Sequence, residues 1–314
     1  MPCYSPLKGY KSIEVTKNGK RKLVFSSKLG YVDMPLEVPC GNCLGCRIDR
    51  SRQWAIRCEH EMQLHTHNCF ITLTYAPEHL PEGGTLVVKH FQDFMKRLRR
   101  RLSNPSDKFF VSTDFKLRFF HCGEYGEKLG RPHYHAIIFG YDFPDKKFFQ
   151  NRGNNVLYRS DFLEELWPYG HSTIGSATWQ SAAYVARYIM KKVTGDAAED
   201  HYRVCDSNTG EIFVKKPEYV TMSRRPGIGK NWFDEYGVGD VYPKGEVITR
   251  AGKKMKPPKY YDTQYEILYP DDMERIRIER KRLASLRKAD NTPERLDVRR
   301  KVHEAKLSRL KREL

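Results

Sequence analysis

Apolar and polar positions along the chain fall into blocks that predict a mixture of strands and helices. Residues 69–75, CFITLTY, are β-branched and aromatic and precede a turn rich in Pro and Gly, which predicts a buried strand. Residues 115–126 and 131–140 are two strand-like runs joined by a Gly-containing turn, which predicts an antiparallel hairpin. Further short strands are predicted around 171–176 and 218–224.

Four other segments have the character of helices. Residues 44–65 and 178–193 hold almost no Gly or Pro, and 160–167 is a shorter run of the same kind. In residues 88–102 the apolar side chains recur at helical intervals and leave a basic opposite face: Val88, Phe91, Met95, Leu98 and Leu102. The order strand, helix, hairpin, helix, strand, helix predicts an α+β fold in which helices pack on an antiparallel sheet.

Composition divides the chain into three predicted domains. Residues 1–65 are a Cys-rich N-terminal flap followed by a basic helix, and residues 66–245 hold the predicted α+β core. Residues 246–314 begin as a basic linker and continue from 273 as helix formers rich in Arg and Lys. We expect this tail to form one or two exposed helices, or to become ordered on a partner.

The charge of the chain narrows the class of partner. Its 314 residues include 56 Lys and Arg against 39 Asp and Glu, a formal net charge of +17. Such a balance predicts binding to a polyanion, because neutralised phosphates release condensed counterions. No run approaches the roughly 18 apolar residues of a membrane span, and the N-terminus lacks the apolar core of a secretory signal. We therefore expect a soluble, cytoplasmic protein that does not act on a membrane.

Two histidines in the predicted hairpin form a candidate metal site. A strand places His133 and His135 on one face, and neutral imidazoles bind divalent metals well. Glu124, across the turn, supplies a carboxylate, and Glu127 nearer the turn tip competes for that role. Two histidines and one carboxylate suit a divalent ion that must also bind substrate. The alternative is a pair of surface histidines on an edge strand.

The helix predicted at 178–193 carries candidate nucleophiles. Tyr184 and Tyr188 are four residues apart and Lys191 follows three later, so the three share one helical face. A phenol with a pKa near 10 needs a neighbouring cation or a metal-polarised phosphate to react at neutral pH. The alternative is that both tyrosines pack in the core.

The cysteines are unevenly spaced. Cys40, Cys43 and Cys46 lie in PCGNCLGC, and either Cys3 or Cys58 could complete a tetrahedral site for structural zinc. The same spacing also occurs in iron–sulfur ligation, and free buried thiols remain the alternative.

A glycine-containing basic loop at 224–232, RRPGIGKNW, lacks the spacing and the Ser or Thr of a phosphate-binding loop of ATPases. The loop therefore does not support an ATPase. Arg224, Arg225 and Lys230 either contact DNA phosphates or solvate the loop. The basic face of 88–102 and the C-terminal tail are further candidates for following a single strand, with aromatic side chains to stack on bases.

Together these motifs resemble a known superfamily. FITLTY, RPHYH and YVARYIMKK, in that order, are similar to the three motifs of the HUH single-strand DNA endonucleases. The two-tyrosine form resembles the rolling-circle replication initiators of microviruses. PCGNCLGCRIDRSRQWAIR, GRPHYH and SRRPGIGKNW resemble the gokushovirus-type group of these phage proteins, and the likeness covers most of residues 1–235.

The resemblance implies a fold and residue roles. It implies an RRM-like or ferredoxin-like antiparallel core, with the histidine pair on a central strand and the tyrosine helix across the sheet. His133, His135 and Glu124 match the ligands of Mg²⁺ or Mn²⁺, Tyr184 and Tyr188 match the nucleophiles, and Lys191 matches the helix lysine.

The resemblance also implies a function. Single-stranded origin DNA would be nicked through a 5′-phosphotyrosine, and the 3′-OH would prime synthesis in the cytoplasm of a bacterial host, with the host helicase and DNA polymerase as partners. The same protein would later rejoin the strand. Two other readings stay open: a non-catalytic basic zinc protein that binds nucleic acid, and a relaxase or transposase of the same superfamily.

Overall fold

The computed structural model describes most of the chain, and its contacts separate two compact units. The described residues are 3–309, except for 17, 18, 20, 127, 128, 154, 188–191, 194, 196 and 206–208. The first unit contains residues 1–50 and 271–312, and the second contains residues 51–270. Grouping by contact thus joins the two ends of the chain, a different division from the three consecutive domains expected from the sequence, which remain a prediction.

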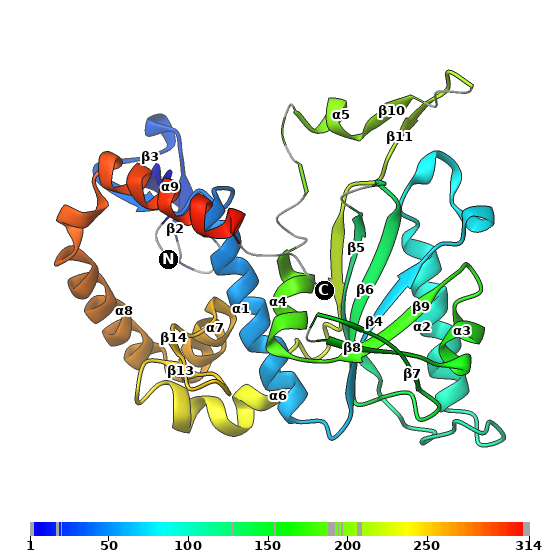
Figure 1. Ribbon diagram of the computed structural model, residues 1–314. Coiled ribbons are helices and arrows are strands. Elements are labelled where there is room, and N and C mark those ends of the chain that lie inside the picture. The colour runs from blue at the N-terminus through cyan, green and yellow to red at the C-terminus, as the bar shows by residue number, and fades with distance from the viewer. Residues whose placement is uncertain are drawn as a thin grey trace. The chain divides into compact units, whose positions relative to one another are not determined.

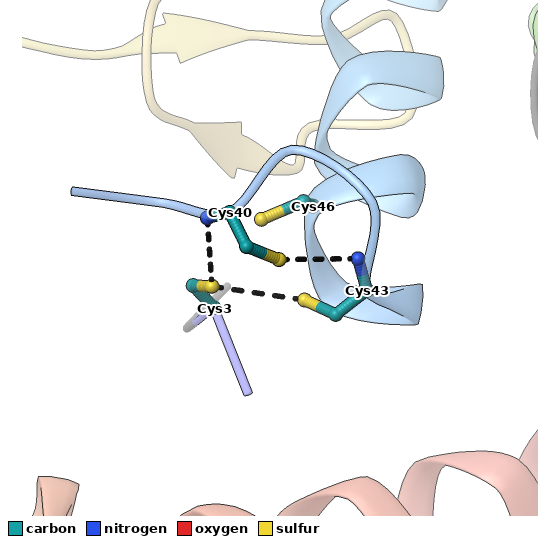
Figure 2. A group of neighbouring side chains, drawn as sticks. All are labelled: Cys3, Cys40, Cys43 and Cys46. Atoms are coloured by element: carbon teal, nitrogen blue, oxygen red, sulfur yellow. Dashed lines mark hydrogen bonds between the residues drawn. The ribbon is translucent and has the colours of Figure 1, made fainter. Parts of the chain in front are cut away.

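The first unit combines a small sheet with helices from the two ends of the chain. Its three strands are antiparallel in the order β2-β1-β3: β1 Leu7–Val15, β2 Arg21–Val24 and β3 Gly30–Val38. The helical part comprises the first turns of α1 (Leu44–Gln63), then α8 (Pro270–Ser285) and α9 (Pro293–Ser308) (Figure 1). At the start of α9 the Thr292 side chain accepts a hydrogen bond from the Arg295 N–H, which caps the helix. In the same unit, Figure 2 shows four cysteines from three chain segments with their sulfurs turned toward one another.

The second unit confirms the predicted α+β core with an antiparallel sheet, which has seven strands. The strand order is β12-β5-β6-β4-β9-β8-β7. The strands are β4 Asn68–Thr74, β5 Arg118–Tyr125, β6 Pro132–Phe139, β7 Lys147–Arg152, β8 Asn155–Arg159, β9 Ser172–Ser176 and β12 Tyr219–Met222. Sequence reasoning missed the hairpin of β7 and β8. Every residue of β7 is exposed, so this edge strand shows no alternation of buried and exposed positions to detect.

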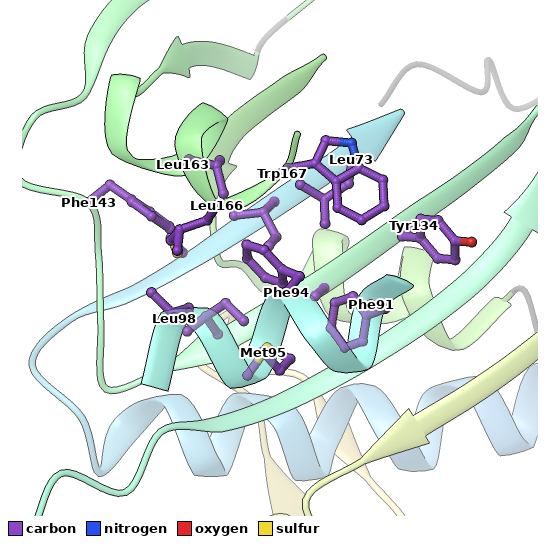
Figure 3. Close-up of a cluster of buried hydrophobic side chains, with 14 of the residues drawn as sticks. Leu73, Phe91, Phe94, Met95, Leu98, Tyr134, Phe143, Leu163, Leu166 and Trp167 are labelled. Atoms are coloured by element: carbon purple, nitrogen blue, oxygen red, sulfur yellow. The ribbon is translucent and has the colours of Figure 1, made fainter. Parts of the chain in front are cut away.

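Helices cover both faces of this sheet and bury two separate cores. On one face lie α2 (Val88–Leu102) and α3 (Asp161–Leu166), whose apolar side chains meet the sheet around Trp167 and Tyr134 (Figure 3). On the other lie residues 51–63 of α1 and α4 (Trp179–Arg187). Successive residues of β6 alternate between the two: Tyr134, Ala136 and Ile138 face α2, whereas Ile137 and Phe139 face α1 and α4. Because the period of a strand is two, His133 and His135 share the face of Ile137.

Smaller elements complete the second unit. They are α5 Ala197–Tyr202, β10 Arg203–Cys205, β11 Ile212–Val214, α6 Lys230–Trp232, the π-helical turns Phe233–Val241, β13 Val247–Ile248, β14 Lys254–Met255 and α7 Lys259–Leu268. Short 3-10 turns lie at Ser27–Leu29, Pro77–His79, Glu82–Gly84 and Lys288–Asn291. Within the part of the chain that the structure describes, no helix is both long and apolar enough to cross a membrane.

A buried carboxylate, that of Glu61, holds the basic loop before α6 in place through hydrogen bonds. Glu61 accepts hydrogen bonds from the Gly229 N–H at 2.6 Å and from Arg118 Nε at 2.5 Å, and its side chain is 1% exposed. Gly229 has φ of 76°, a left-handed conformation that glycine adopts without strain. The guanidinium of Arg57 lies between the rings of Trp54 and Tyr260, at 4.1 and 3.9 Å from their centroids. These contacts give the loop a defined backbone path.

Candidate active site

Three neighbouring strands bring polar side chains to one end of the face covered by α4. β6 lies between β5 and β4, and in this register Glu124 is opposite His133 while Thr72 is opposite His135. The same face continues as the apolar core of Phe70, Phe120 and Ile137. These polar side chains therefore lie at the edge of the apolar core on this face of the sheet.

His135 is held through both ring nitrogens. Its Nε2 lies 2.9 Å from Glu124 Oε1, and its Nδ1 lies 3.0 Å from Thr72 Oγ1. The ring stacks on Phe70 with centroids 5.7 Å apart and planes 5° apart. Both His135 and Glu124 are buried, at 6% and 4% exposure, so this pair is shielded from bulk water.

His133 is held by the backbone. Its Nδ1 lies 2.6 Å from the Arg131 carbonyl oxygen and donates to it, which directs Nε2 away from the strand as the acceptor or ligand nitrogen. Burial lowers the pKa of His133, and the neighbouring His135 lowers it further, so the ring is neutral at pH 7 and able to bind a metal. The two imidazoles are almost parallel, with centroids 6.4 Å apart.

The donor chemistry of Glu124, His133 and His135 fits a divalent ion. One carboxylate and two imidazoles form a mixed oxygen and nitrogen set, and each imidazole has its Nδ1 beside a hydroxyl or a carbonyl, the usual support of a metal-binding histidine. The donor atoms of these three residues do not all lie within 4.8 Å of one another. Among the described residues, one group of potential ligands does meet that spacing, and it consists of four cysteines. Glu127 lies outside the described residues.

Tyr184 reaches the same carboxylate from α4. Its hydroxyl oxygen lies 3.5 Å from Glu124 Oε1, and its ring meets the His135 ring edge to face at 5.1 Å. The helix is positioned by reciprocal capping, in which the Thr178 N–H donates to Ser181 Oγ and the Ser181 N–H donates to Thr178 Oγ1. Tyr184 is thus brought to the histidine pair, whereas Tyr188 and Lys191 lie outside the described residues.

Thr72 is the site residue that sequence reasoning did not single out. Its hydroxyl contacts His135, which is 63 residues away along the chain. A signal was present, because FITLTY places a polar residue at every second position after Phe70, on the face shared with the histidines. Only the register between β4 and β6 decides that Thr72, and not Thr74, lies opposite His135.

A second cluster of potential ligands lies in the first unit. The four-cysteine cluster consists of Cys3, Cys40, Cys43 and Cys46, all half-buried (Figure 2). It could hold a structural metal such as zinc. The structure thus brings in Cys3 as the fourth cysteine, while Cys58 is fully buried in the apolar core of the second unit.

Hydrogen bonds within the cluster favour the thiolate form at one position. Burial raises the pKa of the Cys43 thiol, but hydrogen bonds from the backbone N–H groups of Cys46 and Tyr4 and from the Cys40 side chain outweigh burial and lower the pKa to about 6. Burial raises the pKa of Cys46 to about 12 and that of Cys3 above its ordinary value. A thiolate is the metal-binding form of cysteine, so the cluster already favours one such ligand.

One of the three basic side chains predicted to contact nucleic acid in the basic loop forms an ion pair within the protein. Lys230 forms an ion pair with Asp234 one helical turn later, whereas the side chains of Arg224 and Arg225 are exposed. Their possible role in contacting phosphates remains a prediction.

Comparison with known proteins identifies relatives of this chain. Residues 68–193, from β4 through α4, match the family model "Replication-associated protein ORF2/G2P". The chain is 32% identical to replication-associated protein VP4 of Bdellovibrio phage phiMH2K over 91% of this chain and 85% of that protein. It is 31% identical to replication-associated protein ORF2 of Spiroplasma virus 4, over 75% and 69% of the two chains.

A third relative is replication-associated protein ORF4 of Chlamydia phage 1, with 31% identity over 76% of this chain and 55% of that protein. No solved structure matches the chain. The matched region contains all of β4, β5, β6 and α4, the elements that position Thr72, Glu124, the histidine pair and Tyr184. The chain therefore belongs to the family of replication-associated proteins of microvirus-type phages.

Proposed function

We propose that this protein initiates rolling-circle replication by nicking single-stranded origin DNA in a metal-dependent reaction with a tyrosine nucleophile. The observation that carries the proposal is the convergence of Tyr184 and His135 on one buried carboxylate, that of Glu124. A phenol, a carboxylate and two imidazoles at one end of a sheet provide a nucleophile beside a set of metal ligands.

In this proposal His133, His135 and Glu124 hold Mg²⁺ or Mn²⁺. When bound, the ion would polarise the scissile phosphate and stabilise negative charge on its oxygens. With the ion bound, Thr72 Oγ1 and the Arg131 carbonyl oxygen would each accept a hydrogen bond from Nδ1, which would leave Nε2 of both rings as the ligand nitrogen. The apolar surround of Phe70 and α4 limits the access of water to this side of the group.

Tyr184 is a nucleophile in this scheme. Its phenol oxygen forms a bond to phosphorus, the bond from phosphorus to the 3′ oxygen breaks, the phenol loses a proton and the departing 3′ oxygen gains one. The products are a 3′-OH, which primes synthesis, and a 5′-phosphotyrosine, whose bond conserves the energy for rejoining the strand. Tyr188 would serve as the second nucleophile, taking turns with Tyr184, and Lys191 would stabilise the phenolate.

The surroundings of such a reaction follow from charge and chemistry. The net charge of +17 supports binding of single-stranded origin DNA through its phosphates. The 3′-OH product requires a DNA polymerase, and the duplex requires a helicase to open it, so both would come from the bacterial host, in whose cytoplasm the protein would act.

The test uses the full chain and a tiled set of labelled single-stranded oligonucleotides that covers both strands of the phage genome. We expect a covalent product on a denaturing gel in Mn²⁺ and none in excess chelator, with the DNA attached to Tyr184 or Tyr188 by peptide mass. The double variant His133→Ala/His135→Ala should lose the product. Tyr184→Phe and Tyr188→Phe should each weaken it, and both together should abolish it.

Tyr236→Phe is the control, because Tyr236 is exposed and lies outside the site. An adduct that still forms in the double tyrosine variant would refute the nucleophile assignment. Tight binding to DNA with no adduct on any oligonucleotide, in protein shown to contain Mn²⁺, would instead favour a non-catalytic DNA-binding protein.

A further inference from the structure

The spacing of the four-cysteine cluster matches that of a single tetrahedral metal centre. Cys3 Sγ lies 3.7 Å from Cys43 Sγ, and all four sulfurs lie within 4.8 Å of one another. Four sulfurs at a zinc–sulfur distance of about 2.3 Å have neighbours about 3.8 Å apart in a tetrahedron. A disulfide would require about 2.05 Å. The Cys3 and Cys43 sulfurs are therefore too far apart to be bonded and are at the distance at which one zinc ion would separate them, and all four cysteines are free of disulfides.

Backbone N–H groups converge on the same sulfurs. The Tyr4 N–H donates to Cys43 Sγ at 3.3 Å. The Cys40 N–H donates to Cys3 Sγ at 3.2 Å, and the Cys43 N–H donates to Cys40 Sγ at 3.2 Å (Figure 2). Such donors stabilise negative charge on sulfur and orient it, as the groups around metal ligands do. Four half-buried cysteine sulfurs at this spacing form the donor set of a structural zinc site.

Tyr4 connects this cluster to the other end of the chain. Its backbone N–H donates to Cys43, and its hydroxyl oxygen lies 2.7 Å from His303 Nδ1 on α9. The two rings meet edge to face with centroids 6.3 Å apart. Residues 1–50 and 271–312 belong to one compact unit, so this contact lies within a single body.

We propose that the four-cysteine cluster holds one Zn²⁺, and that this ion fastens α9 to the N-terminal segment through Tyr4. The ion fixes Cys3 and with it the adjacent Tyr4, whose hydroxyl then has a defined position from which to bind His303. Without the ion, Cys3 and Tyr4 would be joined to Cys40 and Cys43 through the hydrogen bonds of the Tyr4 and Cys40 N–H groups, which are weaker than metal–thiolate bonds. The metal thus orders both ends of the chain, and this role is independent of the nicking chemistry.

The first test measures the metal in the full-length protein. We expect about one zinc per chain by mass spectrometry of the metals, and replacement by Co²⁺ should give the visible absorption of tetrahedral cobalt bound to thiolates. Cys40→Ser should lose the zinc, whereas Cys205→Ser, at an exposed cysteine outside the cluster, should keep it. If Cys40→Ser does not fold, the cobalt spectrum of the unaltered chain still shows whether the ion is bound tetrahedrally by thiolates.

Iron with sulfur-to-iron charge-transfer bands, or no metal together with no thiolate–cobalt spectrum, would overturn the zinc assignment.

The second test measures hydrogen exchange over residues 293–308, the span of α9. Chelation of the zinc and His303→Ala should each speed exchange there by roughly fivefold to tenfold, the effect of losing one typical hydrogen bond.

Chelation and His303→Ala should differ in the zinc content of the protein. His303→Ala should retain one zinc per chain, because His303 contacts only the Tyr4 side chain of the N-terminal segment in this proposal. His79→Ala, at an exposed histidine of the second unit, is the control and should change neither zinc content nor exchange in α9. Unchanged exchange in α9 after chelation would refute the link between the metal and this helix.

Discussion

Glu124 and His135 form a buried hydrogen bond of 2.9 Å although they do not face each other in the sheet. In the register of β5 and β6, Glu124 is opposite His133, and His135 is opposite Cys122. The carboxylate therefore bridges diagonally along the face, within reach of the next side chain of the same face. This relationship brings Glu124 close to both histidines.

Replacing the carboxylate tests its role as a ligand. Glu124→Gln keeps the shape of the side chain and removes its charge, so we expect the affinity for Mn²⁺ to fall by at least about tenfold. Binding is measured by titration calorimetry on the protein without DNA. Glu78→Gln, at an exposed position, is the control. Unchanged Mn²⁺ affinity in Glu124→Gln would exclude this carboxylate from the ligand set.

Thr72 is predicted to be a positioning residue for His135. Thr72→Val removes the hydroxyl 3.0 Å from His135 Nδ1 and keeps the branched shape that a strand favours. Losing such a supporting contact lowers metal affinity by about 10- to 100-fold. The ¹⁵N chemical shifts of the imidazole should also report a change in tautomer. Thr263→Val, on an exposed face of α7, should change neither, and a normal tautomer and affinity in Thr72→Val would contradict the prediction.

Glu61 is predicted to stabilise the fold in a pH-dependent way. Burial raises the pKa of Glu61, but hydrogen bonds from His65 and the Gly229 N–H, together with Arg118, outweigh burial and place the pKa below its ordinary value. Glu61→Gln should reduce the free energy of unfolding at pH 7 by about 2 to 3 kcal/mol, the strength of hydrogen bonds to a charged group.

The sign of this pH dependence follows from the lowered pKa. A carboxylate whose folded pKa is lowered contributes its stability above the unfolded pKa of about 4.3 and loses it as pH falls through the folded value. The difference between Glu61→Gln and the unaltered chain should thus be full at pH 7 and shrink below about pH 4. Urea unfolding at a series of pH values measures it. An equal difference at every pH would mean that packing, not charge, dominates.

His60 should make the fold sensitive to mild acid. Its ring is buried, stacks on Trp232 at 3.4 Å and lies 2.9 Å from the Tyr261 hydroxyl, and burial lowers its pKa to about 3. The unfolded chain binds a proton near pH 6.5 and the folded chain does not, so stability falls as pH drops below about 6.5. We expect His60 to lower the free energy of unfolding by about 2 kcal/mol between pH 7.5 and pH 5.

A substitution of His60 distinguishes its effect on the pH dependence of stability from that of other histidines. His60→Phe should lower stability at pH 7.5, because the Tyr261 hydroxyl loses a partner, and should flatten the slope between pH 7.5 and pH 5. Urea unfolding at the two pH values measures both effects. His79→Gln, at an exposed histidine, should leave the slope unchanged. A slope in His60→Phe equal to that of the unaltered chain would show that other groups set the acid response.

Much of the fold was predictable because its elements have strong local patterns. The amphipathic repeat at 88–102 predicted α2 at its observed bounds, and the runs around 69–75 and 131–140 predicted β4 and β6. β7 was missed, because an exposed edge strand is held by backbone pairing that leaves no apolar repeat. The segment 259–268 was interpreted as part of a basic linker, but it forms α7, whose Tyr261 is buried.

The sequence by itself determined which candidate residues share a face, since strand and helix periods place His133 with His135 and put Tyr184 on one face of its helix. Only the tertiary structure decided which side chains from distant segments join them. The register of β4 against β6 selected Thr72, and the packing of α4 brought Tyr184 to Glu124. Likewise, the fold brought Cys3 to the other three cysteines and left Cys58 in the core. Local periodicity fixes the direction of a side chain, whereas its partners depend on long-range pairing that no short window of sequence contains.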